Sequence, residues 1–261
     1  MRLSQKVRTT FISNLHNHIS DLIICISLAE HELSNLVNKY QLKSESFQAF
    51  GSNFIKKAGI SPDAFIQMAI QLASYRLFGQ QVGTYEASQV RPFLHGRTET
   101  VRSVSLESAA FVKIMGLFAQ NKEDLSYRET KLELLRMAVE SHSTYLKKAA
   151  QGRGVDRHLF GLSILAEENN ATLSLFQHPL YQNSKRWRLS TSTLPNNPGF
   201  GPVVSDGVGI GYTVRTNSCF FTLTASKEDG PCLESFSYLL EEALLEMRAL
   251  VDKTSIPDSK L

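Results

Sequence analysis

Apolar residues recur with helical spacing near the start of the chain. One set follows at alternating intervals of four and three positions: Leu22, Ile26, Ala29, Leu33, Leu36 and Tyr40. This spacing places them on one stripe of a helix. We therefore predict a long helix over about residues 19–41. The longest apolar run, Leu22 to Ala29, is too short to span a bilayer.

A second helix is predicted from the segment SPDAF. Ser61 suits the N-cap, Pro62 the first helical position and Asp63 the first turn. Gly79 is a plausible end, because glycine accepts the left-handed conformation at a helix C-terminus. The expected apolar face comprises Phe65, Ile66, Ala69, Ile70, Leu72 and Ala73.

Further helices and strands alternate along the rest of the chain. We expect helices over about Glu129 to Ala150, over RHLFGLSILAEENN with Asp156 as its cap, and from Leu233 to Leu250. RWRLSTST is typical of a strand, and GVGIGYTV and CFFTLTAS of paired strands joined at Arg215–Asn217. This alternation predicts an α/β fold with its core over about residues 45–252.

Composition narrows the function classes. The 261 residues are 42% hydrophobic and 20% charged, and the formal net charge of +3 gives no basis for expecting a nucleic acid partner. Cys25, Cys219 and Cys232 lack C-x-x-C spacing and are interpreted as buried thiols, not as a metal site. We expect no metal centre and no transmembrane segment.

One stretch is unusually polar. TYEASQVRPFLHGRTETVRS, from Thr84 to Ser103, concentrates hydroxyl, carboxylate and cationic side chains in two short extended pieces around Pro92 and Gly96. From the residues alone, a solvated surface strand and a pocket for a small zwitterion are both possible.

Six motifs together resemble the C-terminal half of a carnitine acyltransferase. They occur in family order: SPDAFIQMAIQLASYRLFGQ, TYE, GRTETVRS, GVDRHLFGL, LSTST and GFGPVVSDGVGIGY. The resemblance runs from about Leu33 to Arg248. It implies a mixed sheet covered by helices, similar to chloramphenicol acetyltransferase, and reversible acyl transfer between acyl-coenzyme A and carnitine in fatty acid metabolism. Coenzyme A would be a substrate, so no resident cofactor is expected.

The resemblance assigns the polar stretch to carnitine. The family's carnitine-binding Tyr, Thr and Arg fall on Tyr85, Thr98 and Arg157. Hydroxyls and a guanidinium suit a carboxylate ligand. The choline branch lacks that Arg, because choline has no carboxylate. The family's Ser after TYE is replaced by Ala87, which removes one pocket hydroxyl.

Coenzyme A carries phosphates, and the resemblance points to Lys56, Lys57 and Asp63. The family has two Lys four apart; Lys56 matches the second, while the first falls on Ser52, and Lys57 is a substitute. Asp63 matches the family's Asp near coenzyme A, but a role as a first-turn helix charge is an equal alternative.

In LSTST, the resemblance makes Ser192 the hydroxyl that stabilises the tetrahedral oxyanion of acyl transfer. The next residue is Thr193, as in the palmitoyl-transferring branch, where many acetyl-transferring members have Gln. The acyl chain length is not determined by the sequence.

The family's general base is a His followed three residues later by Asp-Gly. None of the seven His has that pattern: His16, His18, His31, His95, His142, His158 and His178. Three interpretations stay open. The chain is the C-terminal part of a working enzyme, a non-catalytic module that binds coenzyme A, carnitine or a partner, or a chain active through another residue or a separate N-terminal half.

The chain ends in Ser259-Lys260-Leu261 after a polar tail over residues 253–261. A terminal S-K-L is an address read by the peroxisomal import receptor. We therefore expect a peroxisomal location, with that receptor as a partner.

Overall fold

The computed structural model describes residues 5–116, 125–196 and 199–252. The chain divides into two units, Met1–Gln41 and Leu42–Leu261. The first contains helix α1 (Gln5–Asn38), which begins well before the predicted start near residue 19 and ends before Tyr40, which is in a strand and not in the helix as predicted. The predicted tail over 253–261, with Ser259, Lys260 and Leu261, lies outside the described residues.

A mixed six-stranded sheet organises the second unit, and its strand order is β1-β6-β5-β4-β2-β3. The strands are β1 (Tyr40–Phe47), β2 (Thr84–Gln89), β3 (Thr98–Val101), β4 (Leu189–Thr193), β5 (Val208–Val214) and β6 (Cys219–Ser226). β4 pairs in parallel with β2 and β5, whereas β2–β3 and β5–β6 are antiparallel. The predicted pairing of the last two strands is confirmed.

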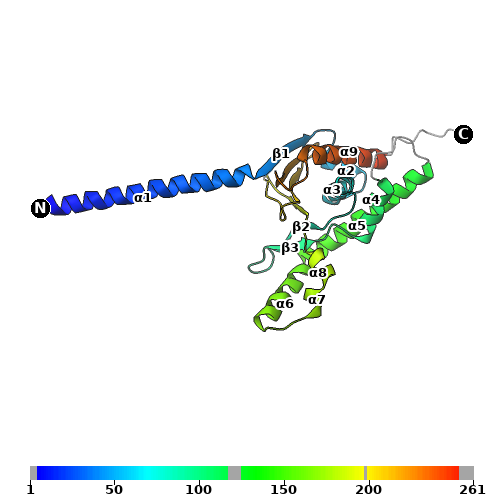
Figure 1. Cartoon of the computed structure of the whole chain (residues 1–261). Coiled ribbons are helices and arrows are strands. Elements are labelled where there is room, and N and C mark those ends of the chain that lie inside the picture. The colour runs from blue at the N-terminus through cyan, green and yellow to red at the C-terminus, as the bar shows by residue number, and fades with distance from the viewer. Residues whose placement is uncertain (1–4, 117–124, 197–198, 253–261) are drawn as a thin grey trace. The chain divides into compact units, whose positions relative to one another are not determined.

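Helices cover one face of this sheet and extend past its β3 edge. They are α2 (Ser52–Lys57), α3 (Pro62–Phe78), α4 (Leu106–Met115), α5 (Leu125–Ala150), α6 (Asp156–Glu168), α7 (Ser174–Gln177), α8 (Pro179–Ser184) and α9 (Leu233–Val251). In Figure 1, α3 lies beside α9, while α6, α7 and α8 form a group next to β3. The expected class, an α/β sheet covered by helices, is confirmed.

The predicted ends of α3 are confirmed. The Ser61 Oγ accepts the Ala64 N–H at 3.5 Å, Pro62 begins the helix, and Gly79 ends it with φ 68°. Asp156 does not cap α6 as predicted, because it is the first helical residue. Its carboxylate instead binds the Arg102 guanidinium.

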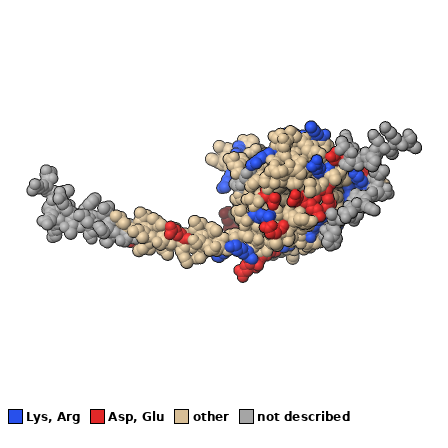
Figure 2. Space-filling view, turned by 90° about the horizontal axis from the view of Figure 1, so that it is seen from above, with Lys and Arg blue, Asp and Glu red and all other residues tan. Residues whose placement is uncertain are grey.

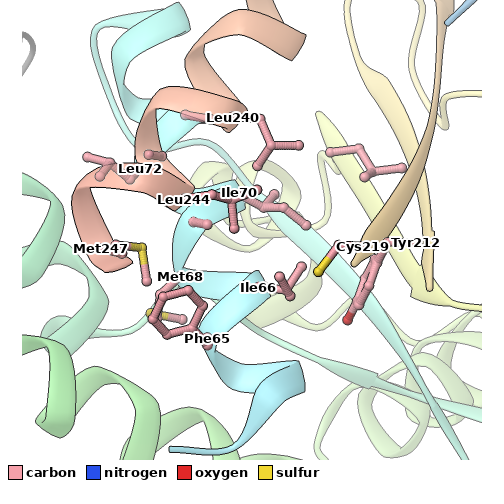
Figure 3. Close-up of a cluster of buried hydrophobic side chains, with 14 of the residues drawn as sticks. Phe65, Ile66, Met68, Ile70, Leu72, Tyr212, Cys219, Leu240, Leu244 and Met247 are labelled. Atoms are coloured by element: carbon pink, nitrogen blue, oxygen red, sulfur yellow. The ribbon is translucent and has the colours of Figure 1, made fainter. Parts of the chain in front are cut away.

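The core lies between α3, α9 and the sheet. Figure 3 shows side chains of α3 and α9 meeting, among them Phe65, Met68 and Met247, with Tyr212 and Cys219 at the sheet. The predicted apolar face of α3 is fully buried. Cys219 is buried as predicted, but Cys25 and Cys232 are exposed, so the expectation of three buried thiols is wrong for those two.

The surface of the second unit carries charges of both signs. Figure 2 shows acidic side chains grouped on one face, with basic side chains around them and no continuous basic field on that side. Of the described helices, none has both the length and the apolarity that a membrane crossing needs.

A buried arginine and two half-buried glutamates join α3 to α9. The Arg76 side chain is 1% exposed; its guanidinium lies 2.6 Å from a Glu246 oxygen and 3.1 Å from a Glu242 oxygen. The Arg76 Nε also donates to the Gly116 carbonyl. Removing one partner of a buried ion pair is costly, because the remaining charges lose their compensation.

We expect Arg76→Ala to lower the free energy of unfolding by about 2–4 kcal/mol, since two carboxylates would remain without their cation. Urea unfolding measures this change. Arg136→Ala, at an exposed position on α5, is the matched control and should change stability by less than about 0.5 kcal/mol. Equal effects of the two substitutions would contradict a structural role for Arg76.

Candidate functional site

Strand β2 presents successive side chains to opposite faces of the sheet. The pairing places Tyr85 opposite Ser190, and Glu86 opposite Thr191. One face, which we call the helix face, carries Glu86, Thr191 and Tyr212 under α3. The opposite, outer face carries Tyr85, Thr98 and Ser192, three of the residues that the sequence assigned to substrate.

Arg157 joins Tyr85 and Thr98 in one hydrogen-bonded cluster. Its Nη2 donates to the Tyr85 hydroxyl at 3.2 Å and to Thr98 Oγ1 at 3.4 Å. Its Nε donates to the Thr98 carbonyl at 3.0 Å. The structure therefore brings together all three residues predicted to bind carnitine, although they come from two strands and a helix.

Arg157 is positioned by residues that the sequence analysis missed. The Glu99 carboxylate accepts the backbone N–H of Arg157 at 3.3 Å, and so satisfies a donor at the start of α6, which has no side-chain N-cap. Arg102 binds Asp156 through two nitrogens, at 2.6 and 3.0 Å. These contacts link sequence positions more than fifty apart, so no local pattern could have revealed them.

The charge of Arg157 is held by neutral oxygen atoms. Among the described residues, no carboxylate forms an ion pair with its guanidinium, while Arg102 is paired with Asp156. A groove of about 310 Å³ beside it is lined in part by Phe93, Thr98 and His158. A small anion could therefore approach Arg157 and gain a charge-assisted hydrogen bond.

Ser192 lies on the same face, one strand away. It sits two residues beyond Ser190, the partner of Tyr85, which is about 7 Å along β4. Gly209 of β5 is opposite Ser190, and a Cβ there would collide with the Phe200 carbonyl. The segment before β5 thus passes close to this face, and glycine makes the close approach possible.

The residues predicted to bind coenzyme A do not join this cluster. Lys56 and Lys57 end α2 with exposed side chains. The Asp63 carboxylate accepts the Tyr212 hydroxyl at 2.6 Å, on the helix face. Asp63 lies in the first turn of α3, and its role toward coenzyme A stays a prediction.

A buried polar network extends across the helix face. The Gln67 amide donates to Thr191 Oγ1 and to the Tyr212 hydroxyl, both at 3.0 Å. The Ser103 hydroxyl lies 2.9 Å from Glu86 Oε2. The other neighbour of that carboxylate is His142 of α5, whose Nε2 is 2.6 Å away. The sequence analysis singled out none of these contacts.

Burial changes the titration of this network. Desolvation raises the pKa of Glu86, although the hydrogen bond to His142 opposes this. Burial alone would lower the pKa of His142, but the hydrogen bond and charge of Glu86, together with Asp63, raise it above its usual range. Burial also holds the pKa of Tyr212 well above its ordinary value.

Ligand atoms of Asp63, Glu86 and His142 lie within 4.8 Å of one another. Protein donors already occupy this space: Tyr212 donates to Asp63, and Ser103 and His142 contact Glu86. The arrangement is that of a hydrogen-bonded network in which each carboxylate has protein donors.

The comparisons establish the family. The model of the Choline/Carnitine o-acyltransferase family matches residues 5–242. Human carnitine O-acetyltransferase is 40% identical over 90% of this chain and 37% of its own length. The human liver isoform of carnitine O-palmitoyltransferase 1 is 38% identical, and chicken choline O-acetyltransferase 35% identical.

The matched chains are much longer than this one. The match to the human palmitoyltransferase covers 84% of this chain and 30% of that enzyme. The match to the chicken enzyme covers 90% of this chain and 37% of that enzyme. It thus spans about a third of the length of the curated relatives it matches. The chain is an α/β protein, and it belongs to the choline/carnitine acyltransferase family.

Solved structures of similar arrangement are more distant. A wax ester synthase/diacylglycerol acyltransferase from Marinobacter aquaeolei VT8 has a TM-score of 0.43 and 12% identity, covering 81% of this chain and 49% of that one. A probable dihydrolipoamide acetyltransferase from Listeria monocytogenes 4b F2365 has a TM-score of 0.44 and 9% identity, covering 90% and 94%.

We expect Tyr212→Phe to lower the free energy of unfolding by about 1–3 kcal/mol, because Asp63 loses a buried donor and Gln67 an acceptor. Thermal or urea unfolding measures the loss. Tyr127→Phe is the control, since its hydroxyl donates to the Ile114 carbonyl at an exposed position. A similar loss in both variants would argue against the buried network.

Proposed function

We propose that this chain carries the carnitine-binding face of a carnitine O-acyltransferase. The observation that carries the proposal is the contact of Arg157 with Tyr85 and Thr98 on the outer face. Carnitine has a carboxylate and a permanent cation. The guanidinium matches the first, and two hydroxyls add neutral donors around it.

Ser192 extends the proposal to the chemistry. Acyl transfer between coenzyme A and carnitine passes through a tetrahedral oxyanion, which a fixed hydroxyl donor stabilises. Ser192 lies on the same face as Tyr85, so an oxyanion formed on a substrate held by Arg157 is within the reach of this strand. Lys56, Lys57 and Asp63 remain the proposed coenzyme A contacts.

The general base is not assigned to this chain. No His of the 261 residues has Asp-Gly at the family's spacing. We propose that the base comes from a polypeptide that pairs with the outer face. In the alternative, the chain binds its ligands without catalysis. A turnover assay distinguishes this alternative from a base supplied by a second polypeptide.

The proposed location is the peroxisome, through Ser259-Lys260-Leu261 and the import receptor that reads it. Deleting those three residues from a fluorescent fusion would disperse the signal if the address acts.

Carnitine binding tests the role of Arg157. We expect isothermal titration calorimetry to show binding of L-carnitine by chain 1–261, and Arg157→Gln to weaken it at least about tenfold by removing the cation. Arg153→Gln, at an exposed position four residues earlier, should bind like the wild type. Choline lacks the carboxylate and should bind equally to wild type and Arg157→Gln. Equal loss of both ligands would contradict the assigned contact.

Turnover separates the two alternatives. Acetyl, octanoyl and palmitoyl transfer should be measured with the chain alone and with a polypeptide matching the preceding part of the relatives. We expect activity only in the mixture, and Ser192→Ala to lower its kcat by about 100- to 1000-fold. Binding without turnover in either preparation would favour the non-catalytic module.

A further inference from the structure

Glu86 is the residue after Tyr85, and its side chain points to the opposite face of the sheet. It is 4% exposed, and the His142 side chain that contacts it is 1% exposed. The Glu86–His142 distance of 2.6 Å is short for a hydrogen bond to an imidazole. The pair therefore constrains the backbone of β2 at the position next to the ligand-facing Tyr85.

A second contact holds the same peptide unit. Thr191 Oγ1 donates to the Tyr85 carbonyl at 3.1 Å and receives the Gln67 amide. The carbonyl of Tyr85 and the carboxylate of Glu86 are thus both fixed by the buried network. A change in the charge of that network acts directly on the part of β2 that presents Tyr85 to Arg157.

The charge of the pair depends on one proton. When His142 is protonated, its imidazolium compensates the charge of Glu86 and the pair is neutral overall. When His142 loses the proton, the buried Glu86 carboxylate has no compensating charge. The Asp63 carboxylate lies within 4.8 Å and adds like-charge repulsion in the deprotonated state. Both effects raise the cost of losing the proton.

We propose that Glu86 and His142 are positioning residues. Their shared proton holds Tyr85 in place on the outer face, and its loss at alkaline pH loosens the cluster of Arg157, Tyr85 and Thr98. The ligand-binding part of this proposal rests on the proposed function, whereas the titration and its effect on Tyr85 do not.

Other titratable groups lie on the elements that pack around the pair. Asp63 approaches from α3 and Tyr212 from β5, while Glu99 lies on the same face of β3. Tyr145 follows His142 by one turn of α5. Burial raises the pKa of Tyr145 and holds that of Tyr212 well above its usual value, so both phenols stay neutral at moderately alkaline pH.

The sign of the linkage follows from these shifts. The pKa of His142 is raised in the folded chain, so the stabilisation is fully present below its ordinary value of 6.5. It is lost as pH rises through the raised value. The pKa of Glu86 is also raised, which likewise means that the folded pair binds more protons than the unfolded chain.

The chain contains a natural reporter for this motion. Trp187 is its single tryptophan, and its ring meets the Tyr85 ring edge-on with centroids 5.9 Å apart. The Arg102 guanidinium lies 4.7 Å above the same indole. Displacement of Tyr85 should therefore change the emission of Trp187 in the absence of any ligand.

We expect Trp187 emission from chain 1–261 to change in one step with a midpoint above pH 6.5. The midpoint should coincide with that of the His142 ring, followed by NMR of histidine-labelled protein. His142→Gln should abolish the step, and Glu86→Gln should move it to lower pH. His31→Gln, at an exposed position of α1, should leave it unchanged.

The comparison of the Trp187 step with the His142 titration in the wild-type chain tests the positioning role even if the variants do not fold. A His142 titration without any response of Trp187 would overturn the positioning role, and so would a Trp187 step retained in folded His142→Gln. Absence of any His142 titration above pH 6.5 would overturn the shared proton.

Ligand binding provides the final measurement. Neither the carboxylate nor the quaternary ammonium of carnitine titrates between pH 7 and 9, so a change in affinity reports on the protein. We expect the Kd to rise about five- to tenfold over this interval in wild type and His31→Gln. A constant Kd would contradict the positioning role. Failure to bind carnitine at any pH would count against the proposed function alone, because the fluorescence step decides the positioning independently.

Discussion

The strict alternation of side chains along β2 is the constraint on which the site depends. Tyr85 and Glu86 are neighbours in sequence, yet one faces Arg157 and the other the buried His142. A slip of one residue in the pairing with β4 would exchange them, placing a carboxylate beside the guanidinium and a phenol in the network. Register is therefore as important to the site as the identity of its residues.

The buried network strengthens this register. An apolar core alone would tolerate small shifts of a strand, since dispersion contacts have little directionality. Hydrogen bonds from Gln67 and Ser103 act differently, because each is lost when its partner moves by one residue. The polar residues under the sheet thus fix the strand register, while the apolar side chains of α3 and α9 cover the sheet.

Sequence reasoning identified the elements with strong local signals. The caps of α3 and the β5–β6 pair follow from local signals, whereas Tyr85, Thr98 and Arg157 follow from the family resemblance of their motifs. It missed β1, whose polar sequence YQLKSESF lacks the apolar alternation of an inner strand, and the short helix α4. It also missed the Glu86–His142 contact, because 56 residues separate the two side chains and no local pattern encodes such a pair.

The way Arg157 is held explains how an exposed cation can still define a site. Glu99 binds its backbone, and the side chain contacts two hydroxyls and a carbonyl, so its geometry is fixed while its charge stays uncompensated. In water such a charge attracts an anion only weakly. The same geometry gains strength when the groove is shielded from solvent, because the attraction grows as the effective dielectric falls. The outer face is therefore organised for a carboxylate, and the affinity it reaches depends on how far the ligand and its surroundings exclude water there.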